Sequence, residues 1–178
     1  LLGEELSRFQ QWFVQGLLGY NLNPSEQAIL EKFFERLISS ALEQPSVLVH
    51  RDFHSRNLML LGAEGLAVID FQDAVMGPVT YDLVSLLRDC YIQWPVERVQ
   101  AWVRSYRERL CSGGLLAHTD EALFLRWFDW MGLQRHIKVL GTFSRLYLRD
   151  GKSNYLADLP RVIQYVLQIV DQYADKEP

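Results

Sequence analysis

The fold of this chain is decided by one short stretch, His50-Arg51-Asp52-Phe53-His54-Ser55-Arg56-Asn57. It follows an apolar segment, Val47-Leu48-Val49, and precedes another, Leu58 to Leu61. Both segments are short and apolar and predict strands, so the stretch between them is expected to form a loop. The loop carries an aspartate and an asparagine five residues apart. Two side chains with oxygen atoms therefore lie close together along the backbone.

A second aspartate follows the next strand. Asp70 stands thirteen residues after Asn57, at the end of the apolar segment Leu66 to Ile69. The turn Gly62-Ala63-Glu64-Gly65 separates this segment from the strand that precedes it, which predicts a β-hairpin. Because a hairpin brings the outer ends of its strands together, we expect Asn57 and Asp70 to converge.

These three residues supply what phosphoryl transfer requires. The reaction needs a carboxylate that accepts or orients the proton of the nucleophile, and oxygen ligands for the magnesium ion that neutralises the phosphates. Asp52 is predicted to be the base, and Asn57 and Asp70 are predicted to be the metal ligands.

The pattern resembles the protein-kinase-like fold, in which H-x-D-x-x-x-x-N is followed by a D-F-G-type aspartate. Gln72 follows Asp70-Phe71 where protein kinases have glycine, and His54 stands where they usually have lysine. At both positions the sequence resembles the aminoglycoside phosphotransferase and choline kinase branch of this fold, which phosphorylates small molecules. The resemblance implies that Asp82 braces the catalytic loop, and we expect His50 to orient the loop by hydrogen bonding.

Most of the chain, from Phe9 to about Tyr165, resembles the bacterial anomeric sugar kinases that phosphorylate N-acetylmuramate and N-acetylglucosamine at C1 during cell-wall recycling. The resemblance implies ATP as the phosphoryl donor, Mg²⁺ as the cofactor, an amino sugar as the partner substrate and its α-1-phosphate as the product. Asp73 would reach substrate hydroxyls, and Arg135 would meet a muramate carboxylate through a bidentate pair. A surface or structural salt bridge explains either residue equally well. Outside the catalytic loop, the resemblance depends on Gln134 to Gly141, Arg145-Leu146, Arg149 to Lys152, Tyr155-Leu156 and Leu159 to Arg161.

Helical patterns dominate the rest of the chain. Apolar residues recur at helical spacing, and Asn23 before Pro24 is a typical helix start. The expected fold is mainly α with a small β-hairpin, and no repeat or linker divides the chain. The expected helices cover residues 3–18, 24–43, 81–87, 96–110, 120–140, 143–148 and 160–173.

A kinase of this fold also needs an N-terminal lobe with a glycine-bearing phosphate loop and a lysine. Only 49 residues precede His50, and their one lysine, Lys32, lies in a helical pattern. The chain begins at Leu1 rather than methionine and contains no P-loop motif. We therefore expect residues 1–178 to form the C-terminal catalytic-loop and substrate lobe, with the nucleotide lobe absent from this chain. By itself the fragment is expected to be inactive or nearly so.

Composition excludes several other classes of protein. The 178 residues are 49% hydrophobic and 22% charged, which fits one globular domain or lobe. A net charge of −4 provides no positive field for a nucleic acid. No apolar run approaches the ~20 residues that span a bilayer, so no membrane partner is expected. With two cysteines and no leader pattern, a cytoplasmic location is the expectation.

Alternative substrates and functions remain open. Choline, homoserine or an aminoglycoside would fit the same catalytic set. Trp94, Trp102, Trp127 and Trp130 could form an aromatic cage for a quaternary ammonium group, although tryptophans at helical spacing more often belong to the core or a pocket wall. A noncatalytic binding lobe that retains the motif is the alternative outside enzymes.

Overall fold

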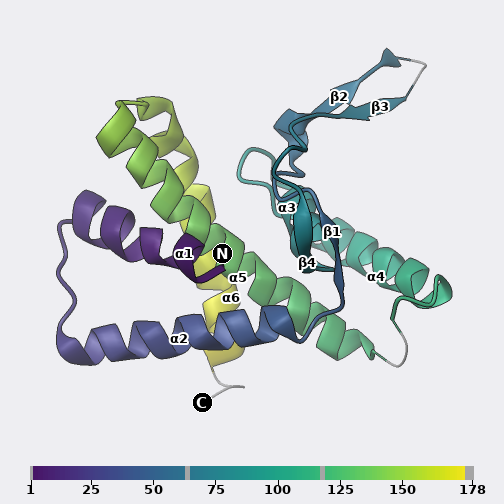
Figure 1. Cartoon of the computed structure of the whole chain (residues 1–178), viewed down its shortest axis with the longest axis horizontal. Coiled ribbons are helices and arrows are strands. Elements are labelled where there is room, and N and C mark those ends of the chain that lie inside the picture. Colours follow the sequence, from purple (N-terminus) through teal and green to yellow (C-terminus); the bar gives the residue numbers. More distant parts are fainter. Residues whose placement is uncertain (1, 63–64, 117–118, 175–178) are drawn as a thin grey trace. The chain divides into compact units, whose positions relative to one another are not determined.

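The computed structural model describes residues 2–62, 65–116 and 119–174 of the chain. These residues fall into two compact units, one within 1–40 and 132–178 and the other within 41–131. Both boundaries lie inside helices, α2 (Pro24–Leu42) and α5 (Glu121–Asp150), so the chain passes between the units without a linker (Figure 1). No helix within the described ranges is long and apolar enough to cross a membrane.

The first unit is helical. Helix α1 (Leu2–Arg8) continues directly into a π-helix, η1 (Phe9–Leu17), and most of α2 follows. The C-terminal part of α5, the 3₁₀-helix η4 (Ser153–Asp158) and helix α6 (Leu159–Ala174) complete this unit. Leu6, Leu37 and Val162 are among its fully buried core residues.

Helix α2 starts where the sequence predicts. The Asn23 side-chain oxygen accepts hydrogen bonds from the backbone amides of Ser25 (2.9 Å) and Glu26 (3.0 Å). The Glu26 carboxylate in turn accepts a hydrogen bond from the Asn23 backbone amide at 2.9 Å. This reciprocal pair is a capping box, which satisfies amide groups that the first turn leaves without helical partners.

Helix α5 differs from the sequence prediction. Two helices, over 120–140 and 143–148, were expected, but one uninterrupted helix covers Glu121–Asp150. The glycine at the expected break, Gly141, serves packing against α1 instead. A Cβ atom built on Gly141 would lie 2.6 Å from the Arg8 carbonyl carbon and 2.6 Å from the Phe9 nitrogen. Only a residue without a side chain allows the two backbones to approach so closely.

Replacing Gly141 with alanine is therefore expected to destabilise the protein by about 2 kcal/mol, because the added methyl group forces the packed backbones apart. Gly3→Ala is the matched control, since its Cβ would meet only Ile38 Cδ1, at an ordinary 3.9 Å. Alanine at that helical position is expected to be neutral or slightly stabilising. Chemical denaturation of both variants tests the contrast, and equal stability would contradict the packing argument.

The second unit contains two small antiparallel sheets. Strand β2 (Leu58–Leu60) pairs with β3 (Leu66–Val68) in the predicted hairpin, although residues 63–64 of its turn lie outside the described residues. Strand β1 (Ser46–Val49) pairs with β4 (Val75–Pro78). The sequence predicted a strand at Val47 to Val49 but none at β4. Glycine and proline disfavour strands, but Gly77 lies directly against Val49, where a Cβ atom would approach the valine Cγ2 to 2.7 Å.

Helices α3 (Tyr81–Leu87) and α4 (Val96–Ser112) and the start of α5 complete the second unit. Its core includes Val84, Val103, Phe124 and Phe128, all almost fully buried. The start of α3 comes directly after β4, beside the segment that precedes β1, where the Val79 backbone amide donates a hydrogen bond to the Pro45 carbonyl at 3.0 Å. From the first turn of α3, Asp82 reaches the segment that follows β1. This arrangement positions the candidate site.

Candidate active site

The stretch from His50 to Asn57 forms a compact loop that ends in a 3₁₀ turn, η2 (Ser55–Asn57). The Asp52 carbonyl accepts a hydrogen bond from the His54 backbone amide at 3.0 Å and another from the Asn57 side-chain Nδ2 at 2.9 Å. The loop thus folds back on itself and fixes the position of Asn57 relative to Asp52. Among the described residues, no hydrogen bond or ion pair occupies the Asp52 carboxylate, which is available to a ligand.

Asn57 and Asp70 converge, as the hairpin predicts. The Ile69 backbone amide donates a hydrogen bond to the Asn57 carbonyl at 3.0 Å, which extends the β2–β3 pairing by one step. As a result the Asn57 side-chain Nδ2 lies 3.4 Å from Asp70 Oδ2. Two of the predicted ligands therefore share one edge of the hairpin.

A divalent cation could be held by the Asp70 carboxylate and by Asn57 Oδ1, because the Asn57 Nδ2 is a hydrogen-bond donor and is directed at Asp52 and Asp70. Carboxylate and amide oxygens are the ligands that Mg²⁺ prefers, and Asp70 is exposed, so an ion can reach it from solvent. The Gln72 side-chain amide donates a hydrogen bond to Asp70 Oδ1 at 2.6 Å and so orients the carboxylate. No group of three or more His, Cys, Asp or Glu side chains suited to a metal occurs in the described ranges. The candidate metal site therefore depends on the Asn57–Asp70 pair.

Asp82 and His50 hold the loop from outside. The Asp82 carboxylate accepts hydrogen bonds from the backbone amides of His50 (2.6 Å) and Arg51 (3.0 Å). The His50 ring Nε2 lies 2.9 Å from the Ile69 carbonyl, so the histidine connects the loop to the strand that leads to Asp70. Burial, followed by the negative charge of Asp82, raises the pKa of the neighbouring Tyr106.

Backbone strain marks the same place. Among the described residues, the two non-glycine residues with a positive φ are Arg51 (74°) and Asp70 (69°). The left-handed conformation is unfavourable for residues with a Cβ atom, and it persists where surrounding contacts hold it. The bond from the Arg51 amide to Asp82 and the bonds around Asp70 provide those contacts.

The two remaining predicted site residues are Asp73 and Arg135. Asp73 is exposed in the turn after Asp70, and no hydrogen bond within the described residues joins it to the other predicted site residues. Arg135 is 5% exposed in α5, within the other compact unit. Their roles toward a substrate stay predictions.

Sequence analysis missed one acidic residue that contacts the loop. The Asp89 carboxylate accepts a hydrogen bond from the Ser55 backbone amide at 2.9 Å and is only 2% exposed. The available signal was an aspartate placed directly after the end of a helix, where a negative charge opposes the helix dipole. Such a position is expected only where another contact stabilises the carboxylate.

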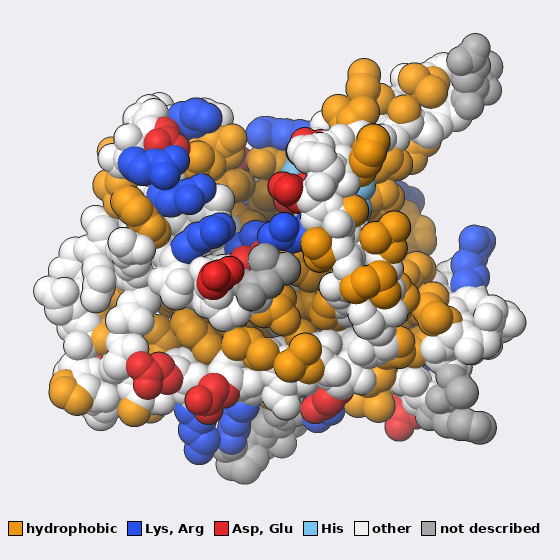
Figure 2. All heavy atoms as spheres, in the orientation of Figure 1, with side chains coloured by type: hydrophobic (Ala, Val, Ile, Leu, Met, Phe, Trp, Pro, Cys, Tyr) orange, Lys and Arg blue, Asp and Glu red, His pale blue; other side chains and the backbone are white. Residues whose placement is uncertain are grey.

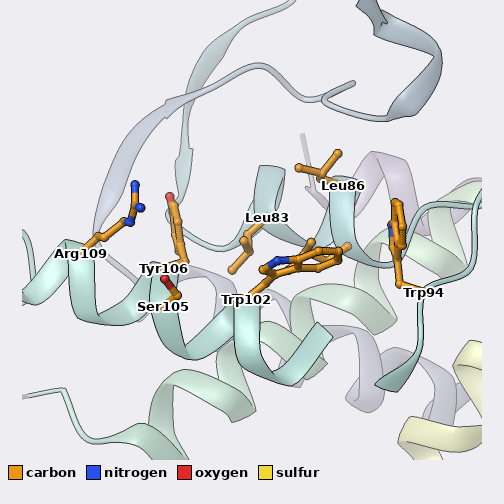
Figure 3. A pocket seen from close by; sticks show the side chains of 8 residues that line it. Leu83, Leu86, Trp94, Trp102, Ser105, Tyr106 and Arg109 are labelled. Carbon is orange, nitrogen blue, oxygen red and sulfur yellow. The ribbon is translucent and has the colours of Figure 1, made fainter. Parts of the chain in front are cut away.

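A pocket with a volume of about 530 Å³ lies between α3 and α4. Figure 3 shows Trp102, Ser105, Tyr106 and Arg109 on α4 facing Leu83 and Leu86 of α3, with Trp94 at one end. The rings of Trp94 and Trp102 meet edge to face, with centroids 5.3 Å apart.

The four tryptophans do not line this pocket together. Trp127 is buried against Phe124, and Trp130 lies near Arg126, whereas Trp94 and Trp102 line the pocket. The guanidinium carbon of Arg98 lies 5.6 Å from the Trp102 ring centroid. A positive group already near the ring, with Arg109 in the pocket wall, disfavours a quaternary ammonium ligand there.

Comparison with known proteins places this geometry in context. The family model described as "Phosphotransferase enzyme family" matches residues 2–123. An N-acetylmuramate/N-acetylglucosamine kinase of Neisseria meningitidis is 45% identical over 175 residues, covering 98% of this chain and 52% of the relative. Kinases with the same name from Pseudomonas putida (42%, covering 96% and 50%) and Pseudomonas aeruginosa (43%, covering 93% and 49%) are similar. The chain thus spans about half the length of these relatives.

Proposed function

Since this chain belongs to the phosphotransferase enzyme family, we propose that it is the catalytic-loop lobe of an ATP-dependent kinase that phosphorylates the anomeric C1 hydroxyl of N-acetylmuramate and N-acetylglucosamine. The observation that carries this proposal is the arrangement of Asp52, Asn57 and Asp70. A carboxylate with no described partner lies on the same loop as an amide whose side chain meets a second carboxylate. This is the residue set that phosphoryl transfer needs.

In the proposed reaction, Asp52 accepts the proton of the acceptor hydroxyl while the hydroxyl oxygen forms a bond to the γ-phosphorus of ATP. The bond from that phosphorus to the bridging oxygen breaks, and ADP leaves with the electron pair. Asn57 and Asp70 would hold Mg²⁺, which neutralises charge on the phosphates when bound. His50 and Asp82 keep the loop in place through the bonds described above.

The choice of sugars is supported by the relatives, which are named N-acetylmuramate/N-acetylglucosamine kinases. The choice of the anomeric C1 hydroxyl follows from the resemblance of the sequence to the anomeric sugar kinases. It also suits the site chemically, because an anomeric hydroxyl is more acidic than an ordinary alcohol and needs less assistance from a base. We place the activity in the cytoplasm, where ATP is available, in the recycling of cell-wall sugars.

We also propose that the nucleotide-binding lobe lies outside this chain, in the part of the protein that precedes it. The chain's coverage of about half of each relative supports this. The β2–β3 hairpin supports it as well, because its apolar side chains are unusually exposed (Figure 2). Apolar surface of this kind is typical of an interface with another domain. The exposed hydrophobic residues of the hairpin and its flanks are Met59, Leu60, Leu61, Leu66, Val68 and Ile69.

The proposed function is tested by ADP release from the full-length protein, with Mg-ATP and N-acetylmuramate, N-acetylglucosamine, choline or kanamycin in parallel. We expect turnover with the two amino sugars and its loss when EDTA removes the metal. The methyl α-glycoside of N-acetylglucosamine is the matched control, because it lacks a free C1 hydroxyl and should not react. Loss of reducing-end signal from the product would locate the phosphate at C1.

Each alternative predicts a different result in this assay. Turnover with choline or kanamycin alone would overturn the sugar assignment and keep the kinase. Turnover of the methyl glycoside would overturn phosphorylation at C1. Magnesium-dependent ATP binding without turnover of any acceptor would favour a noncatalytic lobe.

A further inference from the structure

The segment that follows α3 contacts three consecutive residues of the catalytic loop. Asp89 bonds the Ser55 backbone amide at 2.9 Å. The ring of Tyr91 meets the His54 ring edge to face at 5.4 Å and lies 3.5 Å from the guanidinium carbon of Arg56. We call Asp89 and Tyr91 the loop anchor.

The two carboxylate oxygens of Asp89 accept hydrogen bonds from different backbone amides. Oδ2 accepts the hydrogen bond from Ser55, which lies 34 residues earlier in the chain. Oδ1 accepts a hydrogen bond from the Tyr91 backbone amide at 2.9 Å and so orders the anchor itself. A buried carboxylate is costly unless it is hydrogen-bonded, and here both oxygens are satisfied by backbone amides.

From this geometry we infer that Asp89 is a positioning residue for the reaction, acting on the half of the loop that carries Asn57. This inference rests on the proposed function. Asp82 holds the first half of the loop, at His50 and Arg51, whereas Asp89 holds the second half. Ser55 begins the 3₁₀ turn that ends at Asn57, so a shift of the Ser55 backbone moves the metal-ligating side chain.

Asp89→Asn tests the inference with little change in volume. An asparagine has one acceptor oxygen, so it can keep the local bond to Tyr91, but its NH₂ group then faces the Ser55 amide. In the other orientation the oxygen keeps Ser55 and the bond to Tyr91 is lost; in both orientations two donors face each other, and Asp89 no longer joins the loop to an ordered anchor. Asp129→Asn is the matched control: Asp129 is also buried and pairs with Arg88, outside the loop.

In the full-length protein, Asp89→Asn is expected to lower kcat by roughly a hundredfold with little change in the KM for the sugar. The Mg²⁺ concentration for half-maximal rate should rise by about tenfold, as it does when residues that orient a metal ligand are changed. Asp129→Asn should lower the melting temperature without altering either kinetic property. If Asp89→Asn does not fold, Tyr91→Leu should change both properties in the same direction.

Hydrogen exchange provides a readout that needs no turnover. The backbone amides of residues 53–57 should exchange faster in Asp89→Asn than in the parent or in Asp129→Asn. A variant with parent kcat and Mg²⁺ dependence, or with unchanged exchange in residues 53–57, would overturn the positioning role. If the parent phosphorylates no amino sugar, the proposed function fails, and the exchange comparison still decides whether Asp89 orders the loop.

Discussion

Asp52→Asn is expected to lower kcat for amino-sugar phosphorylation by about a thousandfold, within the range for loss of a general base. The amide is nearly isosteric but cannot accept the proton of the sugar hydroxyl. Because the loop is held through the Asp52 backbone carbonyl, which the substitution keeps, the hydrogen bonds from His54 and Asn57 should survive. The fold and the affinity for ATP should therefore change little.

Steady-state kinetics of the full-length protein check this prediction. Asp171→Asn, an exposed aspartate of α6 in the other unit, is the matched control and should retain the parent rate. A thousandfold loss in kcat with a parent-like melting temperature is the expected pattern. A loss smaller than tenfold would mean that Asp52 is not the base.

Lys138→Met is expected to lower the free energy of unfolding by about 3–5 kcal/mol, the usual cost of breaking a buried ion pair by removing one partner. The Lys138 Nζ lies 3.1 Å from Glu5 Oε1, and the Glu5 side chain is only 2% exposed. The Gln134 amide donates a hydrogen bond to the other Glu5 oxygen at 3.0 Å. Without the lysine, the buried Glu5 carboxylate loses this positively charged partner.

Chemical denaturation measures this loss of stability, and the m-value is expected to stay unchanged. Arg104→Met is the control, because Arg104 and Glu121 form an exposed pair at 2.7 Å, and exposed pairs contribute little to stability. If the two variants lose equal stability, burial does not control the strength of the Glu5–Lys138 pair.

The parts of the site that sequence reasoning predicted are those that local geometry determines. Asn57 and Asp70 converge because they flank one hairpin, so the distance between them follows from strand pairing. The π-helix, the continuity of α5 and the strand β4 depend on partners distant in sequence. The expected break after residue 140 does not occur, and the glycine in that interval, Gly141, is explained by its close contact with the backbone of Arg8 and Phe9.

The role of Asp89 could not be predicted either, because it also depends on a contact with a residue distant in sequence. Its partner Ser55 is 34 residues away, and nothing in the residues around position 89 indicates that pairing. Asp82 could be predicted because the family pattern includes it, not because its neighbours require it. A hydrogen bond from a carboxylate to a distant backbone amide has no repeating sequence pattern. It can therefore be identified only from the three-dimensional structure.

The bonds from Asp82 and Asp89 to the catalytic loop join residues 31 to 34 positions apart. Bringing together two residues this far apart reduces the entropy of the chain before the hydrogen bonds between them can form. Contacts between distant residues therefore form slowly during folding. The catalytic loop is therefore expected to order late, after the local helices have formed. During synthesis, residues 50–57 leave the ribosome before either aspartate and stay unanchored until α3 and Asp89 have followed them.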